Sequence, residues 1–170
     1  MTLIAIDPGT HESAVLEWNG VSPIGMQIVS NAELLRRLRG NATRLPIACE
    51  CVASYGMAVG KEVFETCFLI GRIQEIAHQN GSEFHKIYRK DVKMHLCHSM
   101  KAKDANIRQS LIDRLGKVGT KKTPGPLFGI SSHLWAALAV AVYAHDTISK
   151  PQPLPLGGGE DYTSARLNAA

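Results

Sequence analysis

Apolar residues near the start of the chain come in short runs separated by turn residues, which is the pattern of β-strands. The first run, LIAID, ends at Pro8-Gly9, as expected of a buried strand that leads into a tight turn. The second alternates polar and apolar residues and ends at Asn19-Gly20, a dipeptide typical of hairpins because it tolerates positive φ. The first three runs predict antiparallel strands. The predicted strands cover residues 3–7, 12–18, 21–29, 46–52 and 84–88.

Longer stretches repeat apolar residues every three or four positions, which is the spacing of α-helices. The first begins at Asn31, which can cap it, and stops at Gly40. The longest has an apolar face too broad for one sheet to cover, so part of it is expected to form an interface with a second copy. Helices are predicted over residues 31–39, 58–79, 90–97 and 104–116, and a loop over 118–130.

Residues 133–145, HLWAALAVAVYAH, alternate like a strand but have the alanine and leucine content of a helix. The stretch is longer than a usual strand, and alanine has low strand propensity but the highest helix propensity. A helix is therefore predicted, with Ser131 or Ser132 as its N-cap. Because alanine lets backbones approach closely, this helix is expected to lie flat against the sheet.

The composition is that of a soluble globular protein. The 170 residues, 45% apolar and 20% charged, favour a single domain over residues 1–149. Residues 150–170 hold too little apolar surface to order themselves and are predicted to form a flexible tail. No apolar run is long enough to cross a membrane, and the first residues do not resemble a signal peptide, so a cytoplasmic protein is predicted. The four cysteines lack zinc-site spacing.

Positive charge is concentrated in the middle of the chain. The formal net charge is +4, and between Lys86 and Lys122 eleven lysines and arginines face only three aspartates. Such a section favours a polyanionic partner without requiring one.

Two acids stand out because they lie within or at the end of apolar strands, where a carboxylate is costly unless a cation compensates it. These are Asp7 and Glu50. If their strands are neighbours, the carboxylates converge and suit a divalent metal ion that activates water against a phosphodiester. Ordinary explanations remain open at this point: Asp7 before Pro-Gly suits turn chemistry, and Glu50 can occupy a solvent-facing strand position.

The order of these elements resembles the RNase H-like nuclease fold, and more narrowly the RuvC-like Holliday junction resolvases of bacteria or phages. The resemblance covers about residues 1–148 and is carried by five segments in order. They are IAIDPGT (4–10), CECV (49–52), GKEVFET (60–66), VKMHLCHSMKAKDANI (92–107) and HLWAALAVAVYAH (133–145). It implies an α/β fold with a mixed central sheet, three antiparallel strands followed by parallel ones, flanked by helices.

The resemblance also implies a homodimer that binds four-way or otherwise branched DNA and nicks it with Mg²⁺ or Mn²⁺ at a two-metal site, inside a bacterial cell or a phage-infected host. Asp7 and Glu50 match two metal ligands, and His133 matches a third, as ligand or general base. The fourth position, an Asp in the family, falls on Ala136, which has no donor atom. Positions three apart share a helix face, whereas Asp146 lies too far along the helix to substitute. Weak metal binding and little cleavage are therefore expected.

The DNA contacts expected from the resemblance lie mainly in the cationic section. Lys93 matches a functional lysine of the family, while a second family lysine falls on Asp104, so Lys101 or Lys103 would have to replace it. Tyr55 is a candidate for stacking on an unpaired base. The predicted DNA-binding residues are Tyr55, Arg89, Lys93, Lys101 and Lys103.

The sequence thus predicts a structure-specific endodeoxyribonuclease that resolves Holliday junctions or other branched DNA, inactivated or weakened at Ala136. Two alternatives stay open: a branched-DNA-binding protein without catalysis, and an RNase H-like nuclease that acts on forks or RNA/DNA hybrids. An engineered Asp-to-Ala substitution and a natural pseudo-nuclease both explain Ala136. A sugar-kinase domain, which shares the IDPGT turn, is disfavoured because those enzymes need two such domains.

Overall fold

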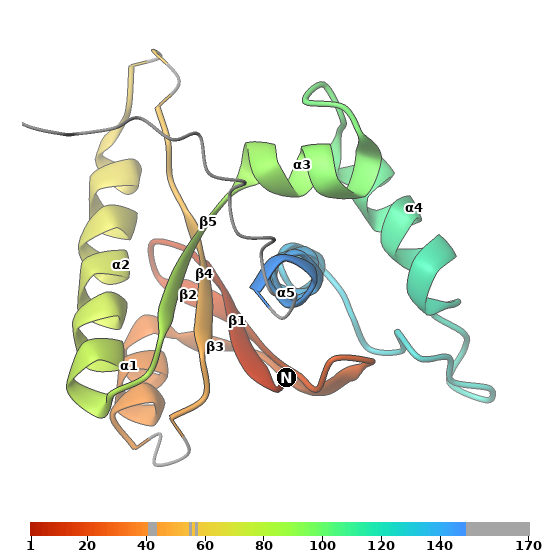
Figure 1. The fold of residues 1–170 in the computed structure, drawn as a ribbon, viewed down its shortest axis with the longest axis horizontal. Helices are drawn as coiled ribbons and strands as arrows, with labels where there is room; N and C mark the ends of the chain where they lie inside the picture. Colours follow the sequence, from red (N-terminus) through yellow and green to blue (C-terminus); the bar gives the residue numbers. More distant parts are fainter. Residues whose placement is uncertain (41–43, 55, 57, 149–170) are drawn as a thin grey trace, which may run out of the picture.

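A five-stranded mixed sheet organises the chain, in the order β3-β2-β1-β4-β5 (Figure 1). The structure is a computed structural model that describes residues 1–40, 44–54, 56 and 58–148. The first three strands are antiparallel, and β4 and β5 run parallel to β1. The predicted α/β fold and its mixed sheet are therefore confirmed. The strands are β1 (Leu3–Pro8), β2 (Glu12–Trp18), β3 (Pro23–Ser30), β4 (Ile47–Cys51) and β5 (Phe84–Tyr88).

Helices cover both faces of this sheet. Figure 1 shows α1 and α2 on one face and α5 on the other, with α3 and α4 stacked outside α5. Along β1 the side chains alternate accordingly, because successive strand residues point to opposite faces. Ile4 and Ile6 join the core under α1 and α2, whereas Leu3 and Ala5 join the core under α5. The helices are α1 (Asn31–Arg39), α2 (Lys61–Asn80), α3 (Arg89–Cys97), α4 (Asp104–Leu115) and α5 (Leu134–Ile148).

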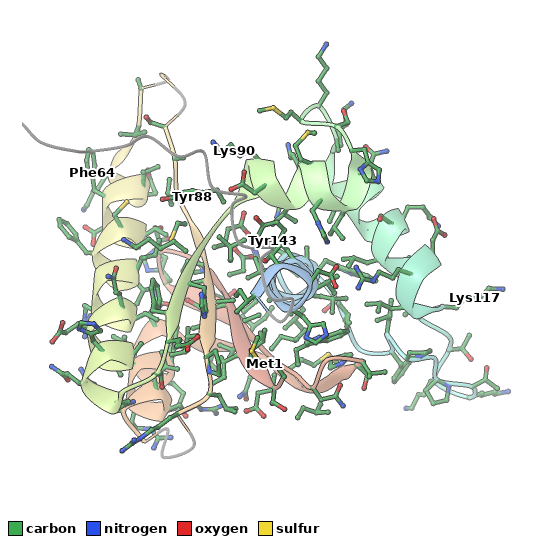
Figure 2. All side chains as sticks on the ribbon, in the orientation of Figure 1. Met1, Phe64, Tyr88, Lys90, Lys117 and Tyr143 are labelled. Carbon is green, nitrogen blue, oxygen red and sulfur yellow. The ribbon has the colours of Figure 1, made fainter. Side chains whose placement is uncertain are left out.

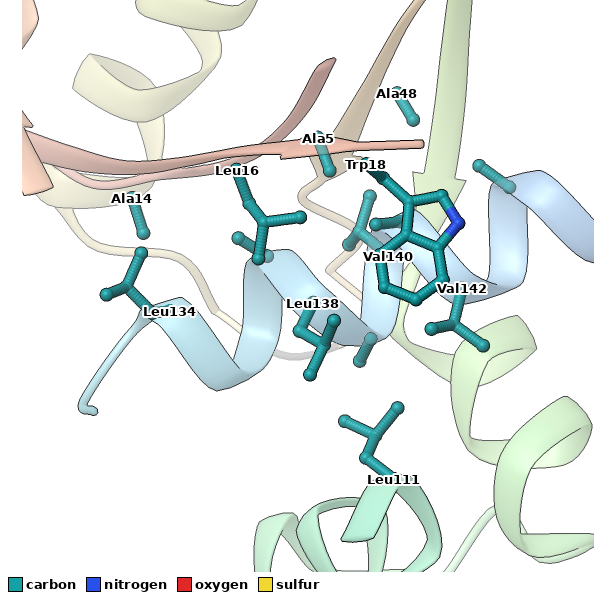
Figure 3. Close-up of a cluster of buried hydrophobic side chains, with 14 of the residues drawn as sticks. Ala5, Ala14, Leu16, Trp18, Ala48, Leu111, Leu134, Leu138, Val140 and Val142 are labelled. Atoms are coloured by element: carbon teal, nitrogen blue, oxygen red, sulfur yellow. The ribbon is translucent and has the colours of Figure 1, made fainter. Parts of the chain in front are cut away.

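Helix α5 lies in the main core, between the sheet and α4. Figure 3 shows Leu16 and Ala5 above the helix and Leu111 of α4 below it. Ala137, Ala141 and Ala144 are fully buried, so the small side chains bring the helix close to the sheet. The helix predicted from the HLWAALAVAVYAH segment is confirmed, and its alternating pattern was the weaker signal.

The start of α5 differs from the prediction. The carbonyl of His133 accepts hydrogen bonds from the N–H groups of Ala136 and Ala137, at 3.0 and 3.1 Å, so His133 occupies the capping position. Ser132 has a positive φ of 47° and belongs to the turn that precedes the helix. The prediction of a serine cap was wrong because this turn ends one residue later than the sequence suggested.

The cap of α1 was also misassigned. Ser30 Oγ accepts from the Glu33 N–H at 3.3 Å and caps the helix. The Asn31 side chain instead donates to the carbonyls of Gly9 and Thr10, at 2.9 and 3.0 Å, and accepts from Ser13 Oγ at 2.7 Å. Asn31 therefore ties the β1–β2 turn, which begins two residues after Asp7, to the start of α1.

Other predictions shift only at their margins. Helix α2 begins at Lys61, three residues later than expected, with Gly60 in the capping position. The tail predicted over residues 150–170 lies outside the described residues. Within the described ranges, no helix is both long and apolar enough to span a membrane.

Replacing Ala141 with leucine should lower the free energy of unfolding by about 1–3 kcal/mol, because the buried site under the sheet leaves no room for a larger side chain. A urea titration followed by circular dichroism measures this change. Ala32→Leu, at an exposed position of α1, is the matched control and should change stability by less than about 0.5 kcal/mol. Equal losses in both variants would contradict the close packing of α5.

Candidate functional site

Two carboxylates meet where neighbouring parallel strands end. Ile6 of β1 pairs with Cys49 of β4, so the next residues, Asp7 and Glu50, follow side by side. Strand alternation places both on the α5 face of the sheet. Each side chain is only 16% exposed. The predicted convergence of these two acids is therefore present in the structure.

Burial makes the negative charge of this pair unfavourable. It raises the pKa of Glu50 to about 7, with a further rise from the nearby Asp7 carboxylate and only partial relief from the Arg89 guanidinium. Burial also raises the pKa of Asp7, although a hydrogen bond and the charge of His133 act against it. Such carboxylates gain from any additional cation that reaches them.

The first turn of α5 lies over the carboxylates. His133 Nδ1 lies 3.2 Å from Asp7 Oδ2, and the imidazole is otherwise well exposed, at 67%. Ala136 borders the same cavity as His133, as their spacing on one helix predicts. Position 136 therefore faces the two acids with a methyl group.

Arg89 connects the carboxylate pair to α4. It follows the last residue of β5 and begins α3, which brings its guanidinium to the end of the sheet. Its Nη1 lies 3.4 Å from Glu50 Oε2, and its Nη2 donates to Asp104 at the start of α4. The structure places Arg89 inside the site, while its predicted contact with DNA stays a prediction.

These groups line one cavity of about 380 Å³. Its polar walls come from the ends of β1 and β4 and from the starts of α3, α4 and α5. The residues that bear on the chemistry are Asp7, Glu50, Arg89, Asp104, His133 and Ala136. Arg108 and Trp135 also line it.

The predicted lysines lie elsewhere. Lys93 is on α3, Lys101 is in the turn after α3, and Lys103 immediately precedes α4, and the cavity lining includes none of them. Figure 2 shows other lysines of the cationic section spread widely, with Lys90 at the start of α3 and Lys117 beyond α4. Tyr55 lies outside the described residues. DNA contacts by these residues stay predictions.

Sequence reasoning missed Asp104, Arg108 and Trp135 as site residues. Asp104 and Arg108 lie one turn apart on α4, and only the packing of α4 beside α5 brings them to the cavity. Trp135 had a local signal, because it lies two residues after His133 in the segment already assigned to the site.

Asp146 lies outside the cavity lining, in agreement with its predicted distance along the helix. It accepts from Arg114 Nη2 at 2.7 Å, and His95 Nε2 lies 2.7 Å away. Hydrogen bonding to Arg114, and secondarily to His95, lowers the pKa of Asp146 to about 2. This carboxylate joins α4 and α3 to the end of α5 and is absent from the cavity lining.

A divalent metal ion fits the cavity only in part. Asp7 and Glu50 provide the hard oxygen donors that Mg²⁺ and Mn²⁺ prefer. Burial raises the pKa of both carboxyl groups, so a bound cation would favour their charged forms. Among the described residues, however, no group of three or more His, Cys, Asp or Glu side chains lies close enough to hold a metal ion. The two carboxylates alone would fill only part of the coordination shell of a metal ion.

Sheet order, helix placement and the acid pair at the strand ends define the RNase H-like class of α/β folds. The particular similarity is to RuvC. A structure of Thermus thermophilus RuvC in complex with a Holliday junction substrate matches with a TM-score of 0.64 and 17% identity, covering 84% of this chain and 92% of that one. A second Thermus thermophilus RuvC structure matches with a TM-score of 0.59 and 20% identity over the same shares. No family model and no curated protein matches the sequence. The chain therefore has the RuvC fold.

The raised pKa of Glu50 makes stability depend on pH. Relative to an ordinary glutamate near 4.5, ionisation of Glu50 is disfavoured in the folded state, so its contribution to stability is full below about pH 4.5 and is lost as pH rises through about 7. Glu50→Gln should therefore stabilise the metal-free protein by about 1–3 kcal/mol more at pH 8 than at pH 4.5, since one pKa unit corresponds to about 1.4 kcal/mol.

Urea midpoints of the metal-free protein at the two pH values test this prediction. Glu65→Gln, on the exposed surface of α2, is the matched control and should show no comparable difference. A pH-independent effect of Glu50→Gln would mean that Arg89 fully compensates the buried carboxylate.

Proposed function

We propose that this protein is a structure-specific endodeoxyribonuclease of the Holliday junction resolvase type, with a metal site weakened at Ala136. The observation that carries the proposal is the buried pair of Asp7 and Glu50 beneath the first turn of α5, in a chain with the RuvC fold. A carboxylate pair of this kind beside a cationic surface suits hydrolysis of a phosphodiester.

Each residue of the site has a chemical role in this proposal. Asp7 and Glu50 would hold Mg²⁺ or Mn²⁺, which when bound stabilises the charge on the reacting phosphate and lowers the pKa of water. His133 orients Asp7 through its Nδ1 contact, and its exposed imidazole can take a proton from the attacking water. Arg89 holds Glu50 in place and adds a fixed positive charge beside the phosphate position.

The weakness of the site follows from position 136. Two carboxylates cannot neutralise two divalent ions, and the alanine at 136 adds neither charge nor donor. Metal binding should therefore be weak or limited to one ion. Engineered and natural origins of Ala136 both remain compatible with this proposal.

Branched DNA is the proposed substrate because the similar RuvC structure holds a Holliday junction, and because two arginines of the cationic section, Arg89 and Arg108, line the cavity. This section forms β5, α3, α4 and the loop that follows, and both α3 and α4 contact α5, whose first turn lies over the carboxylates. Lysines such as Lys93, Lys101 and Lys103 would neutralise phosphates outside the cavity, and binding would weaken steeply with salt.

A homodimer is the proposed form, with α2 as its interface. Phe64 and Phe68 lie one turn apart on this helix and are 54% and 67% exposed. Figure 2 shows Phe64 on the side of α2 that faces away from the sheet. Two aromatic rings in such a position lose unfavourable contact with water when a second copy covers them.

Ala136→Asp should raise Mg²⁺-dependent nicking of a synthetic four-way junction by at least about tenfold, because a third carboxylate would face the metal site. Ala136→Asn is the matched control, since it has nearly the same size but no charge, and it should gain much less. Binding of Mn²⁺, measured by calorimetry, should tighten in Ala136→Asp only.

The same variant separates the alternative functions. Junction binding without any nicking, despite tighter Mn²⁺ binding, would favour a branched-DNA-binding protein. The observation that favours this alternative is Ala136, which lines the cavity without a donor atom. Faster cleavage of three-way forks or RNA/DNA hybrids than of four-way junctions would instead favour a nuclease with a different substrate.

Phe68→Glu should shift the protein from dimer to monomer in sedimentation equilibrium, because a charge would be buried at the proposed interface. Phe128→Glu places the same change on another exposed aromatic residue and serves as the control. A dimer that survives Phe68→Glu would exclude this face of α2 as the interface.

A further inference from the structure

Trp135 and Arg108 form a pair beside the carboxylates. Trp135 lies in the first turn of α5, two residues after His133, and Arg108 lies on α4, one turn after Asp104. The guanidinium carbon of Arg108 is 4.7 Å from the centre of the Trp135 ring, which is the distance of a cation–π contact. Both side chains line the cavity that holds Asp7 and Glu50.

The pair also borders a second hollow, of about 500 Å³. Its remaining lining includes Ala105, Ile130 and the exposed Ser131. Asp104, Arg108, Ser132 and Trp135 belong to both linings, so the two hollows adjoin one another. A strand whose phosphate lies at the carboxylates therefore has room for its next nucleotide here.

Arg108 differs from Arg114, whose side chain stabilises the packing of the helices. Arg114 lies on the same helix and forms an ion pair with Asp146, which joins α4 to α5. Arg108, by contrast, is exposed and takes part in no ion pair or hydrogen bond within the ranges that the structure describes. Its planar group therefore keeps its donors available for an anion.

We propose that Trp135 and Arg108 bind one unpaired nucleotide of the DNA strand, next to the phosphodiester at the carboxylates. A nucleotide presents both groups that this hollow recognises, since its base stacks on the indole and its phosphate accepts from the guanidinium. In an intact duplex each base is already stacked on its neighbours. The subsite therefore favours DNA with a branch point, where a base can leave the stack.

The inference rests on the proposed function, because it assigns a role within DNA binding by the same site. It also gives a reason for a branched substrate that the carboxylates do not supply. Phosphodiester chemistry alone does not distinguish a junction from a duplex, whereas a stacking site for an unpaired base does.

Tryptophan fluorescence in EDTA tests the subsite without cleavage. The chain has two tryptophans, and Trp18 is only 2% exposed, so a ligand that reaches the surface acts on Trp135. A four-way junction should quench the emission of the native protein more strongly than a linear duplex of the same arm sequence. The quenching should disappear in Trp135→Phe, which leaves only the buried Trp18.

Affinity for the same junction provides the second measurement. Trp135→Ala should weaken binding by about 5- to 150-fold, the range of one stacked base, and Trp135→Phe by much less. Arg108→Gln should weaken binding and lower its salt dependence. Arg39→Gln, at an exposed arginine of α1 on the other face of the sheet, is the control and should leave affinity unchanged.

Two results would overturn the subsite while leaving the proposed function in place. One is equal quenching by junction in the native protein and in Trp135→Phe. The other is native affinity in both Trp135→Ala and Arg108→Gln. Failure of the native protein to bind any of the DNA probes would overturn the proposed function and the subsite together. An unfolded Trp135→Ala variant does not affect the outcome, because the comparison of native protein with Trp135→Phe decides it.

Discussion

The parallel pairing of β1 with β4 is the constraint on which the site depends. It sets Asp7 beside Glu50 at the ends of two buried strands, and strand alternation turns both acids toward α5. Helix α5 can cover this edge because its alanines bring its backbone close to the sheet, so that His133 reaches Asp7. The same packing of α5 on the sheet therefore forms the core and brings the site residues together.

Much of this was readable from the sequence because it depends on local patterns. Strand alternation, helical spacing and turn dipeptides identified the elements, and the three-residue spacing placed His133 and Ala136 together. The caps were less predictable. Ser30 and Asn31 both favour helix starts, and only the contact of Asn31 with the β1–β2 turn decides that Ser30 is the cap. Ser132 likewise favours a helix start, but its positive φ places it in the turn before α5.

The tertiary part of the site could not be read in this way. Arg89 reaches Glu50 because β5 lies next to β4, and Asp104 reaches Arg89 because α4 packs beside α5. These contacts join residues far apart in the sequence through interhelical packing that no periodicity encodes. The resemblance drawn from the sequence did not supply them either, because it matched Asp104 to a lysine position.

Two arginines of the cationic section have different surroundings in the fold. Both lie on α4. Arg114 forms an ion pair with Asp146, whereas Arg108 lines the hollow beside the carboxylates. The position of Arg108 depends on the ion pair of Arg114. Arg114 fixes α4 against the end of α5, and a fixed α4 is what keeps Arg108 over Trp135 at the start of the same helix. This ion pair thus helps to position the guanidinium of Arg108, which the proposed subsite would use to bind a phosphate of the DNA.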